Sequence, residues 1–158
     1  METMVFDALL NSPLTYKLEP ADVQILADFV YFRWLEKDEY LFHEDDPAIA
    51  FGYLMEGRLA VLKKASTGKE QIISYLPHGR LVGVMEIIDG EPRVASVKAM
   101  QVSRLLMLKR NDLELIERRF PRIGQSIMIS IVRVLSAHLR QADTILAGMY
   151  GQPAPVIE

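Results

Sequence analysis

The sequence contains no cysteine, which excludes disulfide bonds, zinc–thiolate sites and cysteine nucleophiles. Its three histidines, His43, His78 and His138, lie far apart, without a His-x-His pair, whereas a metal-dependent barrel enzyme needs a denser cluster of ligands. The nucleophile-elbow, Walker A and glycine-rich dinucleotide motifs are absent as well. These absences argue against an enzyme, and we expect no catalytic residue, no metal and no cofactor.

Positive charge and long apolar runs are also scarce. The net charge is -3 and the sequence pI is about 5.7, so long-range attraction to nucleic acid is missing. No apolar run approaches the roughly 20 residues that span a bilayer. The first ten residues carry Glu2 and Asp7 in place of the basic start of a signal peptide. We therefore expect a cytoplasmic protein that contacts neither membranes nor DNA directly.

Three patterns divide the 158 residues, a length that suits one domain. Residues 1–34 are expected to be helical, from the helical spacing of Val23, Leu26, Ala27 and Val30. Residues 35–110 alternate short apolar runs with turn residues, which is typical of a β-barrel or sandwich. Residues 111–149 return to a helical pattern interrupted at Phe120-Pro121. The last stretch, 150–158, is expected to be a flexible tail.

Two local features of the barrel segment carry specific predictions. The apolar runs 51–55 and 59–62 flank Glu56-Gly57, and this pattern predicts a β-hairpin. The single tryptophan, Trp34, is expected in the core because of its large apolar surface.

The long helix predicted over residues 122–149 carries two apolar stripes. One helix face is enough to dock on a barrel, so a second stripe favours a second partner. A parallel two-fold homodimer is the interpretation we favour, and a wide core-facing helix is the alternative. The first stripe follows alternating spacings of four and three residues, as in a coiled-coil seam: Met128, Val132, Leu135, Leu139, Ala142, Leu146 and Met149. The second stripe comprises Ile127, Ile131, Val134 and Ile145.

Residues 81–97, LVGVMEIIDGEPRVASV, resemble the phosphate-binding cassette of cyclic-nucleotide-binding domains. This family includes the bacterial catabolite activator protein and the regulatory subunits of cyclic-AMP-dependent kinase. The approach Pro77-His78-Gly79 and the flanking helices fit the same pattern over residues 10–147. The resemblance implies a mainly β fold with flanking helices: a double-stranded β-helix (jelly-roll) barrel followed by a long C-terminal helix.

The resemblance also implies a ligand site for cyclic AMP or another cyclic nucleotide. The candidate cassette residues are Gly83, Val84, Met85, Glu86, Arg93, Val94 and Ala95. Arg93 would bind the cyclic phosphate, and Gly83 would let the backbone come close. His138 and Leu139 occupy the region of the long helix that would face the base. In the family's DNA-binding branch a further domain follows that helix, whereas this sequence ends at Glu158, so we expect no direct DNA binding.

Three cassette positions depart from the family pattern. Val84 stands where the family has its ribose-binding glutamate, and Val94 stands where it has a phosphate-binding hydroxyl. Each lost hydrogen bond to a charged group costs about 1.5–3 kcal/mol, so two losses weaken binding by roughly a hundredfold to ten-thousandfold if they add. Glu86 replaces a small residue and is expected to be a solvated helix residue.

Two hypotheses follow for the function. In the first, the chain is a stand-alone regulatory sensor of a small phosphate-bearing ligand. Binding would move the long helix about a hinge near Phe120-Pro121. In the second, the cassette has degenerated, and the chain dimerises or docks on an unknown protein partner. An open cavity with Arg93 facing it favours the first, and a cavity filled by Val84, Val94 or Glu86 favours the second.

Overall fold

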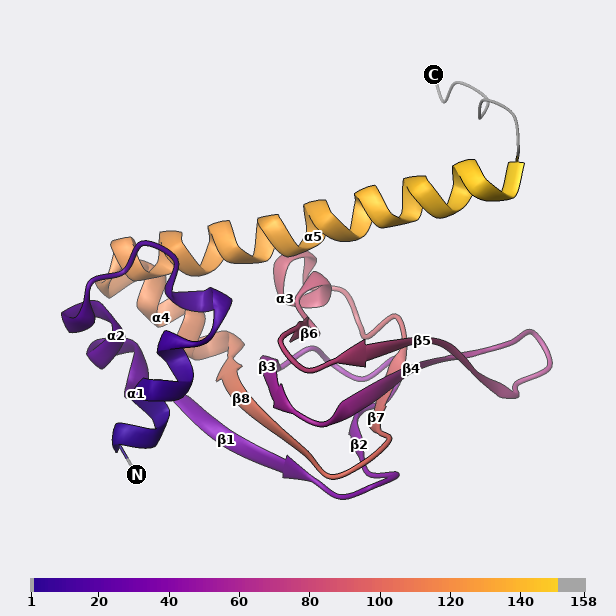
Figure 1. Ribbon diagram of the computed structural model, residues 1–158, viewed down its shortest axis with the longest axis horizontal. Coiled ribbons are helices and arrows are strands. Elements are labelled where there is room, and N and C mark those ends of the chain that lie inside the picture. Colours follow the sequence, from indigo (N-terminus) through magenta and orange to yellow (C-terminus); the bar gives the residue numbers. More distant parts are fainter. Residues whose placement is uncertain (1, 151–158) are drawn as a thin grey trace.

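The computed structural model describes residues 2–150, and the tail predicted over 150–158 lies outside them apart from Tyr150. The helical elements gather at one end of the strands and along one side of them (Figure 1). Their bounds are α1 Glu2–Leu10, the 3-10 turn η1 Pro13–Thr15, α2 Pro20–Ala27, α3 Met85–Asp89, α4 Arg110–Arg119 and α5 Pro121–Tyr150. No helix in this part of the chain is both long and apolar enough to span a bilayer.

Within residues 2–150, eight strands form two four-stranded sheets, which confirms the predicted jelly-roll class. One sheet has the order β1-β8-β3-β6 and the other the order β2-β7-β4-β5, and all pairings are antiparallel. The bounds are β1 Val30–Leu35, β2 Tyr40–Phe42, β3 Ala50–Glu56, β4 Arg58–Lys64, β5 Glu70–Pro77, β6 Leu81–Val82, β7 Ser96–Ala99 and β8 Ser103–Lys109.

The predicted hairpin over Glu56-Gly57 is wrong. The two strands exist, but β3 pairs with β8 and β6, whereas β4 pairs with β5 and β7. Gly57 therefore lies at a corner where the chain passes from one sheet to the other. Its φ is +99°, and a Cβ there would lie 2.7 Å from the Cα of Ser103, so the corner depends on glycine.

The helical prediction for residues 1–34 extends too far. Helix α2 ends at Ala27, and residues 30–35 form strand β1, in register with β8 from Val30 opposite Leu108 to Leu35 opposite Ser103. Aromatic and β-branched side chains favour a strand in this run. Trp34 is 58 % exposed on this strand, so its predicted place in the core is wrong too.

The N-terminal half of α5 is fixed to the body of the molecule. Ile123, Ile127 and Ile131 are fully buried among residues of α1, α2, α4 and the first sheet. The hydroxyl of Ser126 donates to the carbonyl oxygens of Leu14 (3.2 Å) and Tyr16 (2.7 Å). The rest of α5 runs past α3 and along the side of the β4–β5 hairpin (Figure 1), so the helix has one anchored half and one projecting half.

Candidate ligand-binding site

The cassette is built around a left-handed backbone step at Gly83. Its φ is +76°, and a Cβ at this position would lie 2.8 Å from Arg93 Nη1 and 3.1 Å from Phe42 Cε1. Helix α3 follows, and Gly90 caps it with a φ of +77°. Only a residue without a side chain allows the Arg93 guanidinium to approach the backbone this closely.

Arg93 is held by both its backbone and its side chain. Its N–H donates to Asp46 O (2.9 Å), and its carbonyl accepts from the Asp45 N–H (2.8 Å). The guanidinium lies 3.9 Å over the ring of Phe42 and donates from Nη1 to Gly83 O (2.8 Å) and from Nη2 to Ala50 O. Arg93 is only 3 % exposed, so it faces the barrel interior.

The carboxylate of Glu86 completes this arrangement. Oε2 lies 3.3 Å from Arg93 Nη1, and Oε1 accepts from the Val94 N–H at 3.1 Å. Glu86 is 5 % exposed, so the predicted solvated position is wrong. Burial lowers the pKa of the Arg93 guanidinium, and the carboxylates of Glu86 and Asp46 oppose that change. The cassette thus supplies its own anion to its own arginine.

A cavity of about 560 Å³ lies between this cassette and α5. Its lining combines barrel, cassette and helix residues, and most of them are apolar; they include Val61, Leu76, Val84, Val94, Val97 and Leu135. Glu86 lines the cavity, whereas Arg93 is absent from the lining. The cavity is therefore open, yet its cassette end presents a carboxylate that is already paired.

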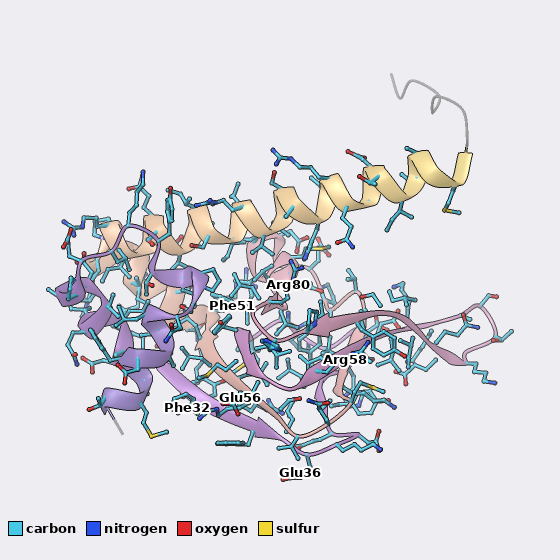
Figure 2. All side chains as sticks on the ribbon, in the orientation of Figure 1. Phe32, Glu36, Phe51, Glu56, Arg58 and Arg80 are labelled. Atoms are coloured by element: carbon cyan, nitrogen blue, oxygen red, sulfur yellow. The ribbon has the colours of Figure 1, made fainter. Side chains whose placement is uncertain are left out.

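Most of the other predicted site residues line the cavity, but not all of them do. Gly83, Met85 and Ala95 line the cavity with the cassette residues already named, and His138 and Ala142 line it from α5. Leu139 is 67 % exposed and lies away from the cavity. Two lining residues that sequence reasoning missed are Phe42 and Arg80. Figure 2 shows Arg80 beneath α5, next to β6.

The apolar stripes of α5 separate along its length. Met128 and Leu135 are half-buried against the core, whereas the other five members of the first stripe are exposed, namely Val132, Leu139, Ala142, Leu146 and Met149. In the second stripe Ile127 and Ile131 are buried, and Ile145 is exposed at the cavity. Among residues 2–150, the first stripe thus has few packing partners.

Comparisons with known proteins agree with this geometry. The model of the cyclic nucleotide-binding domain matches residues 32–119. The cyclic AMP receptor protein of Thermus thermophilus is 27% identical over 133 residues, covering 84% of this chain and 60% of that protein. The neuropathy target esterase of Drosophila melanogaster is 30% identical over 139 residues, covering 82% of this chain but only 10% of the esterase. The chain thus spans about three fifths of the first relative and a tenth of the second.

Solved structures show the same fold. A cyclic nucleotide-binding domain from Methylobacillus flagellatus superposes with a TM-score of 0.84 at 24% identity, covering 98% of this chain and 88% of that one. The catabolite activator protein of Thermus thermophilus gives a TM-score of 0.72 at 27% identity, covering 87% of this chain and 63% of that one. The regulatory subunit of a cAMP-independent protein kinase A from Trypanosoma brucei gives a TM-score of 0.70 at 19% identity, covering 88% of this chain and 47% of that one. The two sheets, the cassette at residues 81–97 and the match over residues 32–119 together establish that this chain belongs to the cyclic nucleotide-binding domain family.

Proposed function

We propose that this chain is a regulatory domain that senses a small molecule in the cavity under α5 and performs no catalysis itself. The cavity volume is within the usual range for small-molecule sites, about 300–1,000 Å³. Its walls come from both the barrel and α5, so an occupant contacts the two parts at once. Occupancy would shift the balance between positions of the projecting half of α5, beyond the anchored Ile131 and not about the predicted hinge at Phe120-Pro121, which precedes the anchored half.

The observation that carries the ligand assignment is the position of the Glu86 carboxylate. It accepts hydrogen bonds from the Arg93 guanidinium, which the family resemblance assigns to a cyclic phosphate, and from the N–H of Val94, which stands where the family has its phosphate-binding hydroxyl. Glu86 therefore acts as an internal replacement for that phosphate. A cyclic nucleotide entering in the standard orientation would have to displace a buried ion pair, and separating such a pair costs several kcal/mol.

The two valines of the cassette also argue against binding of cyclic AMP in the standard mode. Val84 is buried, and Val94 lines the cavity, and neither side chain can form a hydrogen bond. The fold alone does not require cyclic AMP, since function resides in the site. The Trypanosoma brucei subunit with this fold belongs to a kinase described as cAMP-independent. We propose that this chain likewise does not take cyclic AMP by the standard mode.

Calorimetry with cyclic AMP and cyclic GMP tests the proposal. The wild type is expected to show no sub-micromolar binding. A triple variant, Val84→Glu with Glu86→Ala and Val94→Ser, frees Arg93 and supplies both missing polar groups. It should bind at least about a hundredfold more tightly than the wild type, from two hydrogen bonds to charged groups. Glu91→Ala, an exposed carboxylate in the same loop, is the control and should leave binding unchanged.

Two results would contradict this assignment. Sub-micromolar binding of cyclic AMP by the wild type would show that the phosphate displaces Glu86 readily. A folded triple variant without any gain would show that Arg93 cannot serve a ligand even when it is unpaired.

Self-association through α5 is the second function that a specific observation favours. Val132 is 59 % exposed and Leu139 is 67 % exposed, one helical heptad apart on the same face. Exposed apolar rows of this kind are typical of interaction surfaces. We propose a homodimer through this face, with docking on another protein as the alternative.

A further inference from the structure

The carboxylate and the arginine that line the cavity differ in their availability to a ligand. Among the described residues that line it, Glu86 is the one carboxylate and Arg80 the one lysine or arginine. Glu86 is committed to Arg93 and the Val94 N–H at the cassette end. Arg80 precedes β6 and lies beneath α5 (Figure 2). The cation available to a ligand is therefore Arg80, in the turn that leads into the cassette, and not Arg93.

Arg80 shares this end with a second arginine. Arg80 and Arg133 both line an adjoining groove of about 370 Å³, together with Tyr16 and Ser130. The Arg133 guanidinium lies 4.4 Å over the Tyr16 ring. Within residues 2–150 neither arginine has a carboxylate within 4.0 Å. Two like charges that face one groove without an acidic partner favour an anion between them.

Much of the remaining lining of the cavity is apolar. Val61, Leu76 and Val97 of the barrel face Leu135 and Ile145 of α5 across the cavity. A ligand body placed there gains by removing apolar surface from water. A charged group there would lose hydration without a partner.

Building on the proposed sensor function, we infer that the cavity binds an amphiphilic monoanion whose head group lies at Arg80 instead of at Arg93. Its aromatic or branched aliphatic body fills the apolar space, and its carboxylate or sulfonate lies at Arg80 and Arg133. The planar guanidinium of Arg80 binds such a head group through paired hydrogen bonds. Arg133 adds positive charge from α5, so the bound anion interacts with both the helix and the turn before β6.

A matched pair of fluorescent probes tests the charge preference. Anilinonaphthalene sulfonate is anionic, and phenylnaphthylamine has the same rings without the sulfonate. Titration of the wild type should show the anionic probe binding about tenfold more tightly, the effect of a charge-assisted hydrogen bond. Arg80→Gln should abolish that difference while leaving the neutral probe unchanged. Arg119→Gln, an exposed arginine of α4 that does not line the cavity, should leave both affinities unchanged.

A second variant locates the binding. Val94 lines the cavity and is 46 % exposed, so Val94→Trp narrows the cavity without disturbing the core, and both probes should be lost. Decanoate, but not decanol, should displace the anionic probe from the wild type.

Each contrary result points to a different failure. If the wild type binds both probes equally and Val94→Trp loses both, the charge assignment is overturned and the sensor cavity stands. If Val94→Trp binds both probes as the wild type does, the cavity is not the site, and both proposals are overturned. If the affinity for the anionic probe changes with protein concentration, a second copy covers the site, and the small-molecule assignment fails.

Discussion

At the scale of single residues, Arg93 joins the two ends of the cassette, because its guanidinium donates to the Gly83 carbonyl oxygen and pairs with the Glu86 carboxylate. The motif placed Gly83 and Arg93 together, and the structure brings them into contact. The burial of Glu86 could not be predicted, because a helix of only five residues is too short for the spacing of its apolar residues to show which face is buried. Its partner, Arg93, lies seven residues away across a turn, and that proximity depends on the whole cassette fold.

A pair of alanine substitutions separates backbone strain from contact with Arg93. Gly79 and Gly83 both have positive φ, but a Cβ at Gly79 meets no atom within 4 Å. Gly79→Ala should cost about 1–2 kcal/mol from the left-handed conformation alone. Gly83→Ala should cost more, because the new Cβ must displace the Arg93 guanidinium. Urea unfolding of both variants measures the difference, and equal losses would show that the guanidinium moves freely.

Glu44 gives a pH-dependent prediction. Its carboxylate accepts from the Lys64 N–H (3.0 Å) and from Lys63 Nζ (3.0 Å). The backbone hydrogen bond from Lys64 is the main cause that lowers the pKa of Glu44. Because its pKa is lowered in the folded state, Glu44 stabilises the fold at pH values above its unfolded pKa of about 4.3. This contribution is lost as the pH falls through the pKa of the folded state.

The matching experiment compares Glu44→Gln with the wild type. The variant should be less stable at neutral pH, and the difference in urea midpoint should shrink as the pH falls below the unfolded value and through the lowered pKa of Glu44. Glu91→Gln serves as an exposed control. A difference that is the same at both pH values would mean that charge plays no part in the Glu44 contacts.

At the scale of elements, the order of strands and helices could be predicted, but the pairing of strands could not. Turn residues and spacing indicate where an element ends, so the break at Phe120-Pro121 and the long helix after it are confirmed. The partner of β3 is β8, some fifty residues away, and nothing local encodes that choice. The sequence around Gly57 has the pattern of a hairpin turn, because nothing in it shows that β3 and β4 join different sheets.

The structure also decides which residues best test self-association. Leu135 is half-buried and lines the cavity, so changing it would disturb the fold and the site. Val132→Glu with Leu139→Glu alters only exposed positions of the seam. Sedimentation at tens of micromolar should show a dimer for the wild type and a monomer for the variant, because glutamates are costly in an apolar interface. Ala147→Glu, outside the seam, should remain dimeric. A monomeric wild type would refute the seam.

At the scale of the whole molecule, a charge of -3 and the arrangement of arginines bear on partners. Several arginines are already paired: Arg93 with Glu86, Arg104 with Glu56, Arg110 with Glu114 and Arg122 with Asp22. Non-specific binding to duplex DNA comes mainly from lysine and arginine contacts to phosphates. Paired arginines on an acidic chain contribute little to such contacts.

We therefore predict no DNA binding by this chain of 158 residues. A gel-shift assay with random duplex at low salt should show no complex at high micromolar protein, since low salt gives the electrostatic contribution its greatest strength. A basic DNA-binding protein in the same gel serves as the positive control. A discrete, sequence-dependent band would contradict the prediction.

The surface position of Trp34 has a consequence for spectroscopy. Trp34 is the only indole in the chain, and in the folded state it is 58 % exposed on β1. Its emission maximum should therefore shift little on denaturation, so unfolding is better followed by circular dichroism. Replacing it, as in Trp34→Phe, yields a scaffold without tryptophan emission. Adding Val94→Trp to that scaffold places the sole fluorophore at the cavity, where its emission reports how α5 and the cassette move relative to each other.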